Sequence, residues 1–216
     1  MPTASVLSEH TYSRLRDMVL NGTWRSGESL SERELAAKLK VSRMPVREAL
    51  RKLQHDGLLD IVPFRGAFIR KLTAAEVRDI YEVRQAVEGM AAFLAARGGG
   101  ASKLAPFRAL FSELPRTTAA ALRKSQQTGA AFHTAIIEIS GNAKLLAIAE
   151  SLRTQIVLTL NMALKHDPER VRLSIAEHLS ILDAIERRDA SEARERMVAH
   201  LASGLESRLH ILTNLR

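Results

Sequence analysis

The sequence predicts a mainly α-helical protein in which an N-terminal winged helix-turn-helix precedes a C-terminal all-helical bundle. Two short amphipathic helices followed by two strand-like runs lie before residue 72. From Thr73 onward the segments have helical periodicity and no convincing strand. The net charge of +8 and the pI of about 10.3 favour a polyanionic partner. We therefore expect two domains, residues 1–72 and 73–216. Up to Lys71 the chain has thirteen Lys and Arg against eight Asp and Glu.

The first predicted helix covers Glu9–Leu20 and ends at Asn21-Gly22. The residues expected on its inner side are Tyr12, Leu15, Met18 and Val19. Trp24, the single tryptophan, is expected in the core of the small domain.

The next two helices form the predicted helix-turn-helix. Ser31-Glu-Arg-Glu34 is a capping box that begins a helix with Leu35, Ala36 and Leu39 on its inner side. Lys40-Val41 is the turn. Ser42 is placed to cap the second helix, which tolerates Pro45 in its first turn because the N–H that proline lacks would be unpaired there.

This second helix is amphipathic and basic. Its apolar face is formed by Val46, Ala49, Leu50 and Leu53, and its opposite face by Arg43, Arg47 and Arg51. Taken alone, such a helix is equally well explained as a solvated surface helix. The segment after Gly57 makes DNA binding the better explanation.

A predicted two-stranded ribbon comes next. Gly57 ends the helix, and Leu58–Val62 and Gly66–Arg70 are strand-like runs joined through Pro63-Phe64-Arg65-Gly66. A helix-turn-helix with such a wing places one helix in the major groove and a cation at an adjacent groove or phosphate.

Residues 8–72 resemble the winged-helix domain of the GntR superfamily of transcription regulators. The resemblance is carried by Asn21–Leu39, by the run Ser42-Arg-Met-Pro-Val-Arg-Glu-Ala-Leu50, by Asp56–Leu59 and by Pro63–Ile69. It implies contacts with double-stranded DNA from Arg33, Ser42, Arg43, Pro45, Arg47, Arg65 and Gly66. Met44 stands where that motif often has threonine.

The second domain is expected to contain helices over residues 74–97, 106–114, 117–140, 142–165, 168–188 and 190–213. Thr73–Glu76 is a capping box for the first of them. The expected breaks are at Gly98-Gly-Gly100, Pro106, Pro115, Gly141-Asn142, Asp167-Pro168 and Asp189.

This arrangement resembles the FCD ligand-binding domain of the FadR subfamily within the same superfamily. The resemblance covers residues 73 to about 212 and is carried by Tyr81–Glu88, Phe132-His133, Ser140–Asn142, Glu177-His178 and parts of Asp189–His200. It implies a small-molecule effector and a homodimer.

Three histidines, His133, His178 and His200, lie on apolar stripes of different predicted helices. For any one of them, a hydrogen-bonded core histidine is the simpler explanation. Burying a polar ring without a partner costs about 1–3 kcal/mol, and one shared ligand would satisfy all three rings. Three imidazoles suit Zn, Ni, Cu or Fe(II) and leave positions open for water or an anion. We therefore expect a divalent transition metal such as Zn or Ni.

Gly129 is the departure from that pattern. The metal-binding branch of the family has an aspartate four residues before the first histidine, where this chain has Gly129. Loss of a hard, negatively charged ligand predicts weaker metal binding and less preference for Mn or Mg. Zn with extra waters, an anionic effector alone, or no ligand are the outcomes left open.

Arg84 and Asn161 are the candidates for effector binding. Arg84 lies on the apolar face of its helix, where a guanidinium is costly unless it is paired. Glu88, one turn later, offers an internal ion pair. Alternatively, Arg84 clamps a ligand carboxylate bidentately, as the arginine of the matching family motif is thought to do. The two alternatives are compatible if Arg84 exchanges Glu88 for the ligand carboxylate when the effector binds.

Composition and patterning limit where the protein works. The chain has no cysteine, so disulfides and thiolate metal sites are excluded. Residues 1–10 lack the regions of a secretory signal, and the apolar stretch Ile156–Leu164 is far shorter than the ~20 residues of a membrane span. We expect a cytoplasmic protein with no membrane partner.

The expected function is a ligand-responsive transcription regulator, a repressor in preference to an activator, whose homodimer binds an inverted-repeat operator. Arg43 and Arg47 are expected at guanine edges, with phosphate contacts from Arg33, Arg51, Lys52 and Arg65. Two alternatives remain, namely a bundle that only dimerises and a zinc hydrolase. No enzyme is expected, because the sequence offers no well-placed general base, paired nucleophile or glycine-rich phosphate loop.

Overall fold

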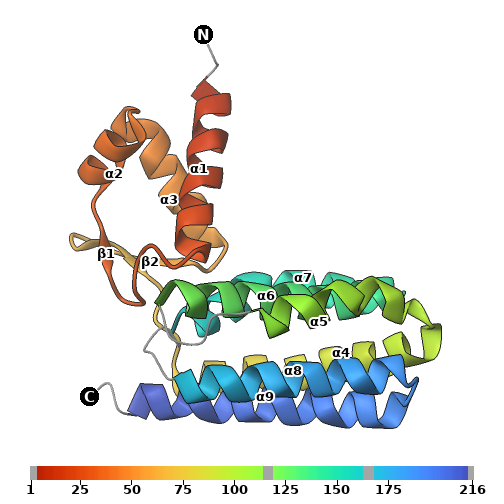
Figure 1. The fold of residues 1–216 in the computed structure, drawn as a ribbon. Helices are drawn as coiled ribbons and strands as arrows, with labels where there is room; N and C mark the ends of the chain where they lie inside the picture. Colours follow the sequence, from red (N-terminus) through yellow and green to blue (C-terminus); the bar gives the residue numbers. More distant parts are fainter. Residues whose placement is uncertain (1–3, 114–118, 163–167, 214–216) are drawn as a thin grey trace. The chain divides into compact units, whose positions relative to one another are not determined.

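The computed structural model describes residues 4–113, 119–162 and 168–213 (Figure 1). Within these ranges the side chains of residues 4–5, 119–123, 160–162 and 168 are not described. The chain forms two compact units. The first contains Met1–Thr73 and Thr154–Met162, and the second contains Ala74–Arg153 and Ala163–Arg216.

The first unit is a winged helix-turn-helix. Its elements are α1 (Ala4–Leu20), β1 (Ser29–Leu30), α2 (Glu32–Leu39), α3 (Arg43–His55), β2 (Leu59–Val62) and β3 (Gly66–Ile69). The strands form an antiparallel sheet in the order β1-β3-β2, with Leu59 opposite Ile69 and Leu30 opposite Ala67. The sequence did not predict β1, because a two-residue strand has no alternation of its own and is held by pairing with β3.

The helix α1 begins at Ala4, earlier than the predicted Glu9. Leu15 and Val19 are buried, while Tyr12 is half-buried and donates a hydrogen bond of 2.5 Å to Asp56 at the end of α3. The prediction that Trp24 lies in the core is wrong. Its ring is half-exposed, and the ammonium of Lys38 lies 5.7 Å from the ring centroid.

The helix-turn-helix itself follows the predicted pattern. The Ser31 hydroxyl accepts a hydrogen bond of 3.4 Å from the Glu34 N–H at the start of α2. Lys40 ends α2 in the left-handed conformation with φ of 57°. Ser42 occupies the N-cap of α3, as predicted, but makes no side-chain capping hydrogen bond. The apolar face of α3 is buried and its arginines are exposed, as expected.

The second unit is helical over its described residues. Its elements are α4 (Ala74–Gly98), the 3-10 helix η1 (Gly100–Leu104), α5 (Ala105–Ser112), α6 (Ala119–Ile139), α7 (Ala143–Met162, shared with the first unit after Arg153), α8 (Pro168–Glu186) and α9 (Ala190–Thr213). Asn142 caps α7 by accepting from the Lys144 and Leu145 N–H groups, and Asp189 caps α9 by accepting from Glu192 N–H. The predicted breaks are therefore confirmed at these two positions.

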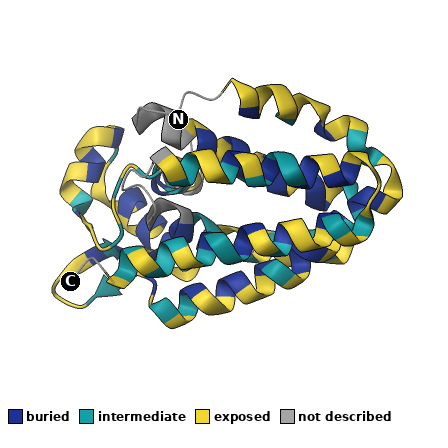
Figure 2. Ribbon diagram, turned by 60° about the horizontal axis from the view of Figure 1, so that its bottom comes forward, coloured by how far each residue is buried: buried dark blue, intermediate teal, exposed yellow. Residues whose placement is uncertain are grey.

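The pairing of α4 with α9 is the most extensive helix contact in this unit. Small residues allow close approach: a Cβ on Gly89 would lie 3.0 Å from Val198 Cγ2. Buried residues follow the inner faces of the helices (Figure 2). Most are apolar and stabilise the unit by about 1.5–3 kcal/mol for each large side chain. The buried charged residues Arg84 and Glu88 break this rule and mark a site.

None of the helices in the described part of the chain is long and apolar enough to cross a membrane.

Candidate functional site

The exposed face of α3 forms one wall of a cleft in the winged-helix unit. Arginines from three elements line this cleft together with the wing residues Ile61, Gly66 and Ala67. The arginines are Arg33 of α2, Arg43, Arg47 and Arg51 of α3, and Arg65 of the wing. Five guanidiniums around one cleft, with a recognition helix as its wall, suit a nucleic-acid backbone and base edges.

Glu32, at the start of α2, organises two of these arginines. Its carboxylate accepts two hydrogen bonds from Arg47, at 3.2 and 3.0 Å, and one of 3.4 Å from Arg43. The Arg47 hydrogen bond is the main reason why the pKa of Glu32 is lowered. Glu32 thus forms surface ion pairs with both of these exposed guanidiniums.

The predicted DNA contacts do not all occupy equivalent places. Arg33, Arg43, Arg47, Arg65 and Gly66 line the cleft. Ser42 is exposed at the start of α3, whereas Pro45 is buried, a position that suits helix packing better than a DNA contact. Lys52 forms an ion pair with Glu9 of α1 and does not line the cleft.

Two exposed apolar side chains were not predicted as part of this surface. Met44 of α3 is 65% exposed, and Phe64 at the wing tip is fully exposed with φ of 62°. Their positions in a recognition helix and a wing tip were visible in the sequence, but exposure is a tertiary property that sequence patterning does not give.

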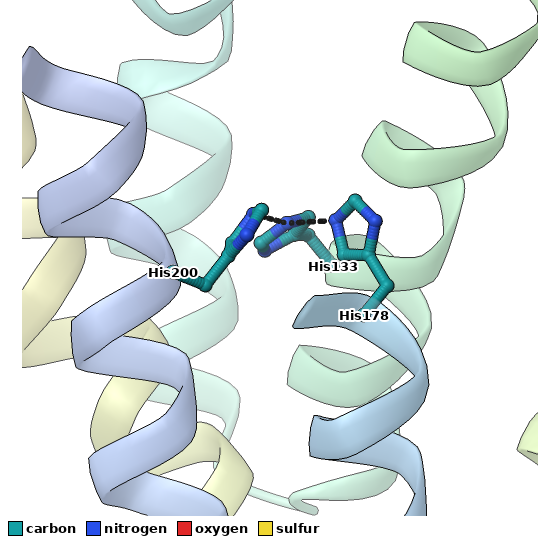
Figure 3. A group of neighbouring side chains, drawn as sticks. All are labelled: His133, His178 and His200. Atoms are coloured by element: carbon teal, nitrogen blue, oxygen red, sulfur yellow. Dashed lines mark hydrogen bonds between the residues drawn. The ribbon is translucent and has the colours of Figure 1, made fainter. Parts of the chain in front are cut away.

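In the second unit, three histidines from three helices converge (Figure 3). His133 comes from α6, His178 from α8 and His200 from α9, and all are buried. The Nε2 atom of His133 lies 3.1 Å from His178 Nε2 and 3.2 Å from His200 Nε2. Sequence spacing predicted that each ring points inward, and the fold brings all three to one point.

Two carboxylates, the buried Glu88 and the half-buried Glu177, hold two of the rings by the opposite nitrogen. Glu88 of α4 lies 2.5 Å from His133 Nδ1, and Glu177 of α8 lies 2.7 Å from His200 Nδ1. A carboxylate beside Nδ1 assigns the proton to that nitrogen and leaves the Nε2 lone pair facing the centre. His178 Nδ1 has no hydrogen-bond partner among the described residues. Its ring stacks on Phe111 at 4.9 Å.

This donor set fits a transition-metal ion. Nitrogens about 2.0–2.1 Å from a zinc ion lie roughly 3.3 Å apart in a tetrahedral arrangement and roughly 2.9 Å apart in an octahedral one. The observed separations of 3.1 and 3.2 Å fall between these values. Without a cation or an extra proton, the Nε2 lone pairs of His133 and His200 would face each other. A bound metal removes that repulsion.

The protonation states also favour metal binding. Burial lowers the pKa of His178 well below its ordinary value and lowers that of His200 to about 4, so both rings are neutral at pH 7. Burial opposes the ionisation of Glu177, but hydrogen bonds from His200 and Arg170 hold its pKa at about 2. Neutral imidazoles backed by ionised carboxylates are the form that binds a metal.

Arg84 is buried and paired. Its Nε donates a 2.6 Å hydrogen bond to Glu88, which in turn contacts His133. The internal ion pair considered for Arg84 is therefore present, and it connects this arginine to the histidines. The side chain of Asn161 lies outside the described part of the structure.

Gly129 borders the histidine cluster. A Cβ there would lie 3.0 Å from Cε1 of His178, closer than ordinary contacts. The absence of a side chain at this position leaves room for the His178 imidazole against α6. The glycine is thus compatible with a three-nitrogen site and provides no carboxylate ligand.

The supporting residues Glu177, Arg170 and Phe111 were not predicted as parts of the site. Arg170 donates to both carboxylate oxygens of Glu177, at 3.0 and 3.1 Å. Glu177 lies on the helix of His178 but supports the histidine of another helix. Spacing within one helix does not reveal such a contact.

These features define a DNA-binding transcription regulator of the winged helix-turn-helix class. The profile "Bacterial regulatory proteins, gntR family" matches residues 7–69, and the profile "FCD domain" matches residues 79–203. The chain belongs to the GntR family and carries an FCD domain.

Relatives over the whole chain have the same character. An uncharacterized HTH-type transcriptional regulator, YdhC of Bacillus subtilis, is 30% identical, with 93% of this chain and 90% of the relative covered. The Nta operon transcriptional regulator of Aminobacter aminovorans is 31% identical, with 90% and 91% covered. A GntR transcriptional regulator from Rhodococcus sp. RHA1 has the same fold, with a TM-score of 0.79, 24% identity, and 97% and 99% of the chains covered. The relatives from Bacillus subtilis and Aminobacter aminovorans are named as transcriptional regulators, and the chain is a regulator and not an enzyme.

Proposed function

We propose that the protein is an effector-responsive repressor that acts in the cytoplasm as a homodimer on an inverted-repeat operator. In this proposal the FCD domain is of the FadR-subfamily type and binds a small carboxylate at a divalent metal held by His133, His178 and His200. The observation that carries it is the convergence of the three Nε2 atoms, with carboxylates behind two of the rings. A similar regulator from Escherichia coli, 29% identical, is named the transcriptional repressor RspR, which supports repression.

The proposed DNA contacts follow from the cleft. Arg43 and Arg47 project from α3 and are exposed, so they reach guanine edges when α3 enters the major groove. Arg33, Arg51 and Arg65 surround them and hold phosphates. Two such surfaces in a two-fold dimer match the two halves of an inverted repeat.

The bundle supplies the response. A bound metal offers open coordination positions to a carboxylate. Protein residues fix the orientation of the proposed metal ligands. Glu88 holds the His133 ring, and Glu177 holds the His200 ring. Arg84 in turn holds Glu88 in the core of the bundle. The effector changes DNA affinity to the extent that it binds one arrangement of the dimer better than another.

A metal titration tests the site. Protein stripped with EDTA is titrated with Zn²⁺ and with Ni²⁺ by isothermal calorimetry. We expect one high-affinity ion per chain, and its loss in His178→Ala. His55→Ala is the matched control, because the His55 side chain is 92% exposed and remote in sequence from the cluster. Equal metal binding by the two variants would refute the three-histidine site.

A DNA-binding experiment tests the rest. An operator is selected from random-sequence DNA with the metal-loaded protein, and its affinity is measured with and without a panel of small carboxylates. Arg47→Ala should lose about 1–3 kcal/mol of operator affinity and relax sequence preference. Unchanged operator discrimination in Arg47→Ala would remove this residue from base recognition. If every carboxylate left DNA affinity unchanged, the bundle would be a dimerisation domain.

A further inference from the structure

Arg208 is a half-buried cation, with a buried Nε atom, that the proposed function does not use. It lies on α9 two turns after His200, with Gly204 between them, so all three residues share one face of the helix. Its Nη1 donates a 2.9 Å hydrogen bond to the Gly204 carbonyl, one turn closer to His200. The guanidinium thus points back toward the histidine end of the helix.

The ring of Tyr81 joins Arg208 to the site already described. The Arg208 Cζ atom lies 5.6 Å from the centroid of this ring, and Arg84 Cζ lies 4.9 Å from the same centroid. Arg84 holds Glu88, and Glu88 holds His133. Arg208 and Arg84 therefore both lie beside the Tyr81 ring, and Arg84 is linked through Glu88 to His133.

Arg208 differs from Arg84 and Arg170 in having no carboxylate partner among the described residues. Its Nε atom is buried and has no hydrogen-bond partner within the part of the chain that the structure describes. Arg84 is paired with Glu88 and Arg170 with Glu177. Burial lowers the pKa of Arg208, and the guanidiniums of Arg84 and Arg170 act in the same direction. A guanidinium with a buried nitrogen that lacks a partner is unfavourable unless a ligand compensates it.

The charge balance of the cluster specifies that ligand. Among the described residues, three arginines (Arg84, Arg170, Arg208) face two glutamates (Glu88, Glu177), and the surplus positive charge is that of Arg208. A divalent metal at the three histidines would add two further positive charges. A monocarboxylate lowers this net positive charge by one unit and leaves most of it uncompensated. A dicarboxylate lowers the net charge by two units.

Gly204 keeps the space around this cation. A Cβ at this position would lie 3.2 Å from Tyr81 Cε1 and 3.6 Å from Arg208 Nη1. The first distance is tighter than most real contacts, so a side chain would displace the Tyr81 ring that lies beside both arginines. The absence of a side chain here is consistent with a preserved position for the guanidinium.

We propose that Arg208 is a second anion anchor of the bundle and that the effector is a dicarboxylate, with one carboxylate on Arg208 and the other on the metal. This inference rests on the proposed metal site for its second contact. It assigns Arg208, in preference to Arg84, as the free guanidinium, because Arg84 already donates to Glu88.

The unliganded protein provides the first test. In carboxylate-free HEPES buffer with EDTA, Arg208→Met should raise Tm by about 2–4 °C, because it replaces a half-buried charge, whose buried Nε has no described partner, with an apolar side chain of similar length. Arg194→Met is the control, since Arg194 is exposed on the same helix and the charge change is identical. A lower Tm for Arg208→Met than for the control would mean that Arg208 is a structural residue and would overturn the proposal.

The second test uses ligands. Zn²⁺-loaded protein is heated with malonate, succinate, glutarate or adipate, and with the monocarboxylate of the same chain length, at constant ionic strength. We expect at least one dicarboxylate to raise Tm by more than its monocarboxylate in the wild type and in Arg194→Met, and this difference to disappear in Arg208→Met. No preference for a dicarboxylate in the wild type, or a preference retained by Arg208→Met, would refute the assignment.

Calorimetry with Zn²⁺ alone separates this inference from the proposed function. Arg208→Met should bind Zn²⁺ at least as tightly as the wild type does, since Arg208 contacts none of the three histidines in the described structure and its removal lowers the positive charge near them. Loss of Zn²⁺ binding in His178→Ala alone supports the metal site regardless of Arg208. A wild type that binds no metal would refute the proposed metal site, and the Tm of Arg208→Met would still decide whether Arg208 is an unpaired cation.

Discussion

Glu32 is the residue that controls the charge of the DNA-binding cleft. Its carboxylate pairs with Arg43 and Arg47 and partly neutralises them. In Glu32→Gln both guanidiniums lose this partner and reach phosphates freely. We expect tighter binding to random-sequence DNA, a salt dependence steeper by about one unit in log K against log[salt], and a smaller preference for the operator.

The measurement is fluorescence anisotropy with operator and scrambled duplexes between about 50 and 200 mM salt. Glu34→Gln, an exposed glutamate of the same helix with the same charge change, is the control. If both variants gained affinity equally, net charge alone would explain the effect and Glu32 would have no organising role.

His200 gives the metal-free protein a defined pH dependence. Its pKa is about 4 in the folded protein, below the 6.5 of an unfolded chain, because the ring is buried. As the pH falls through 6.5 the unfolded state takes up a proton that the folded state does not, so stability is lost between about pH 6.5 and 4. The loss from this group is on the order of 3 kcal/mol.

Urea denaturation in EDTA between about pH 8 and 4.5 measures this dependence. His200→Gln should have a shallower decline, while His55→Gln, at an exposed site, should follow the wild type. Glu177 does not interfere with this measurement. Its pKa falls from 4.5 to about 2 on folding, so its contribution to stability is lost only below about pH 4.5. Parallel curves for all three proteins would show that His200 is not buried in neutral form.

Residue positions explain what the sequence could predict of the site. Arg43, Arg47 and the three histidines were found because each lies at helical spacing relative to an apolar stripe. Phe111 and Arg170 were not, because each contributes through a neighbouring helix. For Pro45 the sequence suggested more than the structure supports. The family motif implies a DNA contact at this position, whereas Pro45 is buried against the rest of the unit.

At the scale of elements, the turn of the helix-turn-helix contains a residue in a strained conformation. Lys40 ends α2 with φ of 57° and ψ of 45°, a region that costs a residue with a Cβ about 1–2 kcal/mol. Lys40→Gly should therefore stabilise the winged-helix unit by up to about 1 kcal/mol, after the greater flexibility of unfolded glycine is subtracted.

Thermal unfolding followed by circular dichroism measures the change. Ala37→Gly, an exposed position inside α2, should instead destabilise by about 1 kcal/mol, because helix-interior glycine is unfavourable. A loss of stability in both variants would mean that the side chain of Lys40 contributes more than its backbone strain removes.

The helices were predictable because their ends are encoded locally. Asn142 and Asp189 cap α7 and α9. Where both can be compared, the predicted helix ends agree with the described ones to within two residues, except at the start of α1. The predicted boundaries at 114, 117 and 165 and the breaks at Pro115 and Asp167 lie outside the described residues. The strand β1 and the helix η1 were missed. Each is very short, and β1 is held by its pairing with β3, which is distant in the sequence.

At the scale of the whole molecule, the chain combines a unit whose stability depends on its apolar core with a unit whose core contains the charged pair Arg84 and Glu88 and three buried histidines. A metal binds the folded bundle and not the unfolded chain. Zn²⁺ at about 100 times its dissociation constant should therefore stabilise the bundle by about 2.7 kcal/mol, which corresponds to a rise in Tm of about 5–11 °C for a chain of this size.

Differential scanning calorimetry with Zn²⁺ and with EDTA measures this linkage. Because the histidines belong to one compact unit, we expect Zn²⁺ to move the transition of the bundle and to leave any separate transition of the winged-helix unit unchanged. His178→Ala should abolish the shift, and Lys40→Gly should move only the other transition. A single transition that responds to both changes would show that the two units unfold together, in which case an effector in the bundle could act directly on the stability of the DNA-binding unit. No response to Zn²⁺ would contradict metal binding, because a ligand specific to the folded state cannot leave its stability unchanged.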